Sequence, residues 1–233
     1  LDMPGRALSR NLFRTVYGAH PYGLPIIGTR ESVDSFSREH VLEFFQSWYR
    51  PSNLTFIVVG DFDLEHMQQL IQEQFGEMED APIPRQQRAV EPPQQSLRTT
   101  LEFRDTQEGH FAVGLHVPGL RHDDIPALEL LSIVLGQGES SILYREVKRN
   151  RELATSTYAY LYTPRDPGVL MIGANLRTQE DPVDPLEVLD AILENTFALR
   201  NAPVSSQELE RARTLLRSET IYERETVQGR ANR

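Results

Sequence analysis

Apolar residues recur every three or four positions along much of the chain, a spacing that places them on one face of a helix. The predicted helices begin close to Gly5, Ser37, Asp63, Asp124, Ser140, Asp184 and Ser205. Glu208 follows Ser205 by three residues, as in a capping box. Pro51 and Gly76 are stop signals for the second and third helices.

Apolar runs of a different kind predict strands between these helices. The run Leu54–Val59 is apolar or β-branched throughout, which is typical of a buried central strand. Residues 97–103 and 111–117 alternate between apolar and other side chains, which indicates strands with one buried face. Two further strands are expected near residues 154–162 and 168–176. Helices and strands together predict an α+β fold.

A change of composition between the third helix and the later strands predicts a domain boundary. Residues 77–95 hold four prolines among glutamine, arginine and glutamate, with little periodicity: Pro82, Pro84, Pro92 and Pro93. Such a segment is expected to be an extended, partly stiff linker. We therefore divide the chain into residues 1–78, a linker at 79–96, and residues 97–233.

Charge and composition exclude some classes of protein. The net charge of −10 and the pI of about 5.1 argue against nucleic acid as a partner, because binding phosphates needs a basic face. The chain has no cysteine, so disulfides and thiolate metal sites are absent. No apolar run is long enough to predict a membrane span. The near-absence of lysine, with Lys148 as the single one, hints at a GC-rich bacterial gene; the compartment, periplasm or cytoplasm, stays open.

Four consecutive segments carry a family resemblance in the first part of the chain. Residues 19–23 read Ala-His-Pro-Tyr-Gly, and residues 25–32 read Pro-Ile-Ile-Gly-Thr-Arg-Glu-Ser. An amphipathic segment then ends in Trp-Tyr-Arg-Pro-Ser-Asn at 48–53, before the apolar run that leads to Asp63. This order resembles the second half of the catalytic domain in the pitrilysin/insulinase family of zinc peptidases.

The later part of the chain carries its own match to the same family. Residues 110–120 resemble the first inner strand of the family's second half, and Leu-Gly-Gln-Gly at 135–138 resembles its Leu-Gly-Gly-Gly turn. Residues 140–144 and 204–212 resemble its Ser-Ser-Arg-Leu-Tyr segment and its late Val-Ser-x-x-Glu-Leu helix. The resemblance implies two related α/β layers that close like a clamshell around a peptide. The chain would hold the end of the first half, the linker and the first two-thirds of the second half.

The family's zinc motif, His-x-x-Glu-His, does not occur in this chain. The two Glu-His pairs, at 39–40 and 65–66, have no histidine three residues earlier. The resemblance implies that zinc is bound in the parent protein by residues upstream of Leu1, where it would activate water for peptide hydrolysis. We expect no catalytic and no metal-binding residue in this fragment, and no peptide hydrolysis by it.

In the family's second half, an arginine and a tyrosine seven residues later hold the substrate and stabilise the oxyanion. Lys148 and Thr155 occupy these two positions here. Lysine keeps the charge but loses the bidentate geometry of arginine, and threonine is too short to replace a phenol. The resemblance therefore implies that a paired family subunit carries the arginine and tyrosine, and that the parent of this chain carries the zinc. We therefore name no substrate-binding residue in this chain.

The remaining candidates have simpler interpretations. His20 precedes a proline in a turn, which favours a structural or exposed role over metal binding. His110 and His116 share one strand face and are candidates for lining a chamber, whereas His40 and His66 are expected on helix surfaces. Residues 136–141 are more typical of a helix–helix turn than of a phosphate loop. The alternating tyrosines are a substrate wall or, by default, a half-buried strand face: Tyr158, Tyr160 and Tyr162.

Two rivals to the peptidase hypothesis remain open. The first is a non-catalytic member of the same family that serves as a structural or substrate-holding subunit, as the resemblance allows. The second is an unrelated α/β binding protein, which would require the ordered motif matches to be accidental. The sequence upstream of Leu1 discriminates the first rival, because the zinc motif is present only in an enzyme.

Overall fold

The computed structural model describes residues 3–85, 87–178 and 182–232, and they form two compact units. The first, which we call the sheet unit, comprises Leu1–Leu24 and Ala89–Ser218. The second, the helical unit, comprises Pro25–Arg88 and Glu219–Arg233. The two units are defined by the packing of their residues. The division predicted from the sequence, at residues 78 and 96, concerns domain boundaries and stays a prediction.

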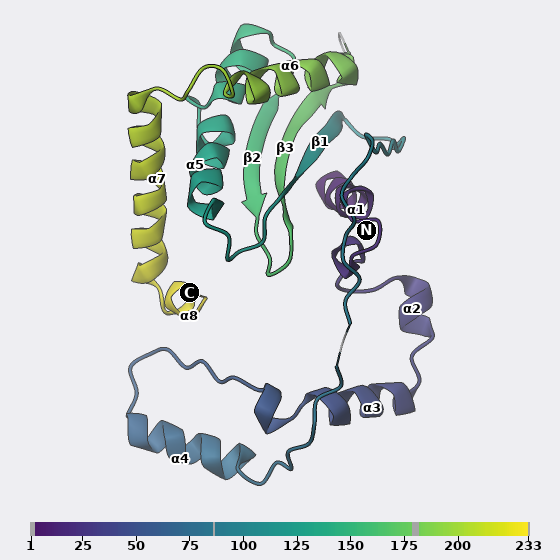
Figure 1. Ribbon diagram of the computed structural model, residues 1–233, viewed down its shortest axis with the longest axis vertical. Coiled ribbons are helices and arrows are strands. Elements are labelled where there is room, and N and C mark those ends of the chain that lie inside the picture. Colours follow the sequence, from purple (N-terminus) through teal and green to yellow (C-terminus); the bar gives the residue numbers. More distant parts are fainter. Residues whose placement is uncertain (1–2, 86, 179–181, 233) are drawn as a thin grey trace. The chain divides into compact units, whose positions relative to one another are not determined.

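An antiparallel sheet organises the sheet unit (Figure 1). Its strands are β1 (Glu108–Val117), β2 (Ser156–Tyr162) and β3 (Gly168–Arg177), in the order β1-β3-β2. Strand β3 therefore pairs on both sides, and nearly all of it is buried. The strands predicted at 111–117, 154–162 and 168–176 are thereby confirmed, with ends shifted by a few residues.

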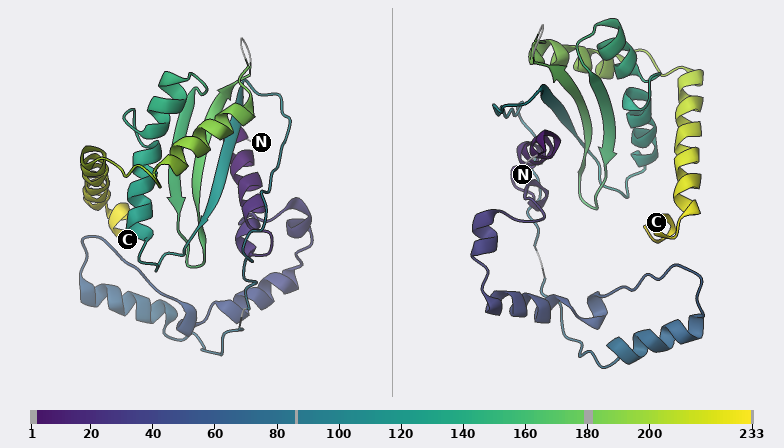
Figure 2. Two further views of the ribbon diagram at one scale, coloured as in Figure 1. Left: turned by 45° about the horizontal axis from the view of Figure 1, so that its top comes forward. Right: turned by 180° about the vertical axis from the view of Figure 1, so that it is seen from behind.

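One face of the sheet carries the main hydrophobic core. Helices α5 (Ile125–Gly136) and α6 (Pro185–Ala198) contribute Leu135 and Ile192 to it, and both side chains are fully buried. Ile172 of β3 belongs to the same cluster. Figure 2 shows these two helices on the same side of the sheet. The even-numbered apolar residues of β3 therefore point into this core, as strand alternation requires.

Helix α1 (Pro4–Val16) packs on the opposite face of the sheet. Val16 clusters with Val169 and Met171, the odd-numbered side chains of β3. The approach is close at Gly114, where a Cβ would lie only 2.7 Å from a methyl group of Val16. Glycine in β1 therefore allows the helix to rest on the strand.

Two helix starts in the sheet unit, those of α6 and α7 (Ser206–Glu225), follow the expected chemistry, whereas Asp124 precedes α5 without a side-chain cap bond. The Asp184 side chain accepts a hydrogen bond from Leu186 N at 2.9 Å and caps α6. Ser205 and Glu208 exchange side-chain-to-backbone hydrogen bonds of 3.2 Å at the start of α7, so the predicted capping box is confirmed. Between α5 and β2 the chain forms a π-helix at Tyr144–Asn150, wider than the helix that the apolar spacing predicts.

The helical unit contains α2 (Arg30–Asp34), α3 (Arg38–Trp48), α4 (Leu64–Phe75) and α8 (Val227–Ala231). Short 3₁₀ turns occur at Pro51–Asn53 here and at Pro21–Gly23 in the sheet unit. The Ser37 and Asp63 side chains cap α3 and α4, as expected. Helix α2 escaped the sequence analysis because it spans a single turn and lacks an apolar stripe.

Two predicted strands do not form. Residues 54–59 are unpaired, and Phe56 and Ile57 are 46% and 69% exposed. The described part of the helical unit offers no neighbouring strand, so the apolar run has no ladder to join. Residues 97–103 instead run beside α1: Thr100 is hydrogen-bonded to Thr15 at 2.7 Å, and Glu102 accepts a bond from Asn11 at 2.6 Å. The prediction of strands at these two places is wrong.

The α+β fold class is confirmed at the level of the whole chain by its helices and its antiparallel sheet. Within the residues that the structure describes, no helix combines the length and apolar character needed to cross a bilayer.

Candidate functional site

The structure gives Lys148 and Thr155 different surroundings. The Lys148 ammonium nitrogen lies 4.8 Å from the centroid of the Tyr144 ring, a cation–π contact within the π-helix. Thr155, just before β2, donates its hydroxyl to Glu108 Oε1 at 2.9 Å, with Asn175 O as a second acceptor at 3.3 Å. The hydroxyl is therefore committed to neighbours inside the chain.

Glu108 connects Thr155 to a chain of hydrogen bonds across the end of the sheet. Asn175 Nδ2 donates to Glu108 Oε2 at 3.2 Å, and Asn175 Oδ1 lies 3.0 Å from His110 Nδ1. The register of β1 and β3 creates this chain, because His110 pairs directly with Asn175. We call Glu108, His110, Thr155 and Asn175 the sheet-end network.

The sheet-end network determines the tautomer of His110. A carboxylate only accepts hydrogen bonds, so the Asn175 amide must present its NH₂ group to Glu108. Its carbonyl oxygen then faces His110, which must donate from Nδ1. In the neutral ring, Nε2 is therefore the nitrogen that accepts hydrogen bonds.

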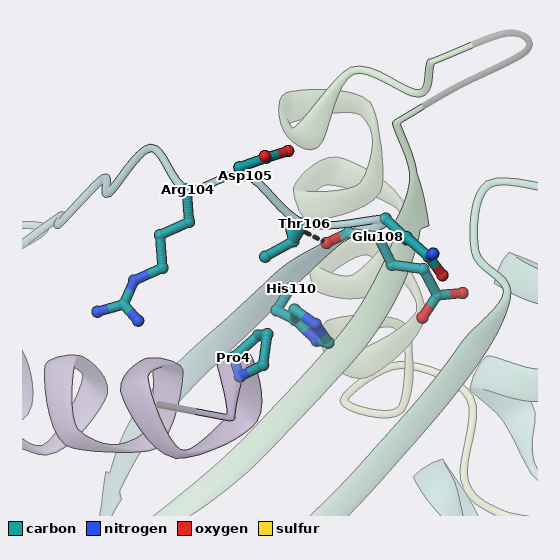
Figure 3. A pocket seen from close by; sticks show the side chains of 7 residues that line it. Pro4, Arg104, Asp105, Thr106, Glu108 and His110 are labelled. Carbon is teal, nitrogen blue, oxygen red and sulfur yellow. Dashed lines mark hydrogen bonds between the residues drawn. The ribbon is translucent and has the colours of Figure 1, made fainter. Parts of the chain in front are cut away.

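A pocket of about 520 Å³ opens beside this network (Figure 3). Glu108 and His110 line it together with the segment before β1 and the first residue of α1: Pro4, Arg104, Asp105, Thr106 and Gln107. The Thr106 hydroxyl donates to the backbone oxygen of Glu108 at 2.8 Å and stiffens the turn into the strand. Figure 3 draws Arg104 and Glu108 on opposite sides, with Thr106 and His110 between them.

A second polar cluster surrounds His20, which is only 5% exposed. His20 Nδ1 accepts from Tyr22 N at 3.2 Å, and His20 Nε2 lies 3.5 Å from Asp166 Oδ2. Tyr22 also donates its hydroxyl to Asp166, while the Tyr17 hydroxyl donates to Pro167 O at 2.7 Å. Burial, reinforced by neighbouring tyrosines and a glutamate, raises the pKa of Tyr17. These contacts hold the turn after α1 against the β2–β3 connection. The role of His20 is therefore structural.

Glu91 closes the turn after α1 from the other side. Its carboxylate accepts hydrogen bonds of 2.8–3.0 Å from three consecutive backbone N–H groups, those of Gly18, Ala19 and His20. Arg98 donates to the same carboxylate at 3.1 Å. Burial alone would raise the pKa of Glu91, but the backbone N–H groups and the guanidinium lower it to about 2. We call Glu91 and Arg98 the clasp.

The other histidines and tyrosines lie in different places. His116 is exposed and touches the Tyr17 ring edge-on, with 5.7 Å between ring centroids. His40 and His66 are exposed on α3 and α4, as expected for surface residues. On β2, Tyr158 stacks on Tyr160 at 6.2 Å between centroids. Residues 136–141 connect α5 to the next helical segment, so the helix–helix turn interpretation is confirmed.

The described residues do not bring three histidine, aspartate or glutamate side chains together as metal ligands. They therefore do not offer a ligand set for a zinc ion. The sequence analysis missed Glu108, Asn175, Asp166 and Glu91 as members of polar clusters. No local signal marks these residues, because each has a partner 47 or more positions away in the chain; of the partners of Glu91, Arg98 alone lies nearby.

Comparison with known proteins identifies the family. A family model described as the peptidase M16 inactive domain matches residues 35–216, more than two-thirds of the chain. The chain belongs to this family of pitrilysin- and insulinase-like peptidases, as the resemblance in its sequence indicates.

Similar proteins from bacteria carry names that refer to zinc proteases. A protein of Mycobacterium leprae named as an uncharacterised zinc protease is 32% identical over 179 residues, which cover 74% of this chain and 39% of that protein. The zinc protease PqqE of Helicobacter pylori is 27% identical over 207 residues, 85% of this chain and 45% of PqqE. The chain thus spans about half the length, or less, of these relatives.

Solved structures support the fold. The crystal structure of a Helicobacter pylori protease matches with a TM-score of 0.87 and 25% identity, over 98% of this chain and 55% of that one. An M16-like peptidase from Alicyclobacillus acidocaldarius matches with a TM-score of 0.80 at 21% identity, over 99% of this chain and 55% of that one, which concerns the fold alone. The predicted pitrilysin-like fold is thereby confirmed.

Proposed function

We propose that this chain is the non-catalytic part of a zinc metallopeptidase that hydrolyses peptides inside a clamshell chamber. The match to the inactive peptidase domain carries the proposal. It is supported by relatives that are named zinc proteases and are about twice as long. Zinc would be bound by residues outside the chain, since the described residues offer no ligand set.

In this proposal the chain contains parts of both homologous halves of the peptidase. Residues 1–78 end the first half, residues 79–96 link the halves, and residues 97–233 begin the second half. This division concerns homology, whereas packing groups residues 1–24 with residues 89–218.

The second half supplies no arginine–tyrosine pair to the substrate in this proposal. Lys148 faces the Tyr144 ring and Thr155 is bonded to Glu108, so both are engaged with their own chain. A paired family subunit would supply the arginine and tyrosine, and the protein would act as the zinc-bearing member of the pair. If the whole protein lacked zinc, the non-catalytic structural or substrate-holding subunit would be the better account.

Substituting Lys148 is expected to leave peptide hydrolysis nearly unchanged. The whole protein, isolated from its own host with its subunits kept together, is assayed on a quenched fluorescent peptide. Lys148→Ala is expected to keep kcat/KM within about twofold, because the ammonium of this half-buried residue is engaged in a cation–π contact within its own chain, worth roughly 0.5–2 kcal/mol. A chelator is the control and should abolish hydrolysis, with recovery on adding zinc. A loss of about 100-fold in the variant would assign Lys148 to the oxyanion and contradict this part of the proposal.

A further inference from the structure

The pocket beside the sheet-end network combines negative charge with hydrogen-bond acceptors. Asp105 and Glu108 bring two carboxylates, and His110 brings a ring whose Nε2 accepts in the neutral form. Arg104 is the cation among the lining residues, but its guanidinium is bound to Glu102, with Nε and Nη2 at 2.8 and 2.7 Å from Glu102 Oε1. The pocket therefore favours a ligand that is positively charged and donates hydrogen bonds.

The sheet-end network holds the Glu108 carboxylate in place before any ligand arrives. Thr155 donates to Oε1 and Asn175 donates to Oε2, so both oxygens are oriented while each keeps further lone pairs for a ligand. Such preorganisation lowers the entropic cost of binding. The pocket, at about 520 Å³, is within the size range of small-molecule sites and large enough for a long side chain.

We propose that this pocket binds the cationic side chain of an arginine or lysine residue in a peptide, with Glu108 as the principal contact and Asp105 and His110 as additional acceptors. The inference rests on the proposed function, because it takes a peptide as the ligand, and it adds a preference among peptides. Thr155 then acts as a positioning residue, since it orients Glu108 without touching the peptide. A multivalent metal ion is a poorer occupant, because the described residues form no group of three ligands.

The test measures peptide binding to the whole protein after chelation, so that bound peptide is not cut. The probes are fluorescent peptides with acetylated and amidated ends that differ at one position, arginine or citrulline, which have nearly the same shape but differ in charge. By fluorescence anisotropy, the arginine peptide is expected to bind about tenfold more tightly, which corresponds to one charge-assisted hydrogen bond. Glu108→Gln is expected to remove this preference.

Two further variants keep the test independent of folding. Asp105→Asn changes an exposed residue of the pocket and is expected to reduce the preference by about twofold to threefold, as for a solvent-screened charge. Glu194→Gln makes the same chemical change at an exposed glutamate that is paired with Arg151 outside the pocket, and should leave the preference intact.

Equal affinity for the arginine and citrulline peptides would overturn the inference, and so would a preference that survives in Glu108→Gln. A preference that appears only when the peptide N-terminus is left free would also overturn it, because the α-ammonium would then be the group bound. None of these results concerns the proposed peptidase function, which depends on the zinc content of the whole protein.

Discussion

Glu91→Gln is expected to lower the free energy of unfolding of the sheet unit by about 3 kcal/mol at pH 7, and by almost nothing near pH 2. The pKa of Glu91 is lowered from 4.5 to about 2 by hydrogen bonds from three backbone N–H groups and from Arg98, which outweigh the effect of burial, and one unit corresponds to roughly 1.4 kcal/mol. The side chain is only 4% exposed, so solvent screens these bonds little. Glutamine has a single acceptor oxygen, and its NH₂ group would face backbone donors.

The direction of the pH dependence follows from the lowered pKa. The Glu91 carboxylate takes up a proton less readily in the folded chain than in the unfolded chain. Its contribution to the free energy of unfolding is therefore complete above the pKa of the unfolded chain, about 4.5. It is lost progressively as the pH falls from about 5 to about 2. The difference in the free energy of unfolding between the original chain and Glu91→Gln should therefore decrease over this pH range.

The difference in the free energy of unfolding of the sheet unit is measured in urea, with hydrogen exchange of the β3 amides as the probe of unfolding. The fluorescence of Trp48, the single tryptophan, reports on α3 in the helical unit and is unsuitable. Glu194→Gln is the matched control, because its partner Arg151 is also exposed, and its effect should stay below about 1 kcal/mol. A difference for Glu91→Gln that stays constant between pH 7 and pH 3 would contradict the role given to its charge.

Gly136→Ala is the second change with a large expected effect, a loss of about 3 kcal/mol in the stability of the sheet unit. Gly136 ends α5, and a Cβ at this position would overlap the backbone nitrogen of Ala159 in β2 and approach Tyr158. The neighbour is strand backbone, so relief requires α5 to move away from the sheet. That movement would disturb the packing of Leu135, which is fully buried in the core.

Gly5→Ala is the control for the same substitution. Gly5 lies in the first turn of α1, and a Cβ there meets nothing within 4 Å. Alanine is the better helix former, so this variant is expected to be stabilised by up to about 1 kcal/mol. The same exchange experiment compares the two variants. If the Gly136→Ala variant were as stable as the original chain, α5 could not pack on β2 as closely as described.

Local signals in the sequence were sufficient to place most helices. Ser37, Asp63 and Asp184 each cap the helix they were expected to start, because a cap depends on residues within three positions of it. The alternation in 111–117 likewise identified β1. These features depend on short-range geometry, which a single sequence contains.

Features that depend on distant partners could not be predicted in this way. Residues 54–59 have the composition of a central strand, but a strand needs a neighbour, and the described residues of the helical unit supply none. The sheet-end network depends on the register that pairs His110 with Asn175, and register is a tertiary property. Lys148 and Thr155 were identified by family position, whereas their actual contacts needed coordinates.

The zinc content of the whole protein, purified without added metal and measured by elemental mass spectrometry, is the most direct test of the proposed zinc peptidase. A zinc-bearing peptidase should hold about one tightly bound zinc ion per whole chain, and the 233 residues of this chain, purified in the same way, should hold none. A whole protein that holds no zinc, even after zinc is supplied, would contradict the assignment to a zinc-bearing peptidase and favour the non-catalytic subunit.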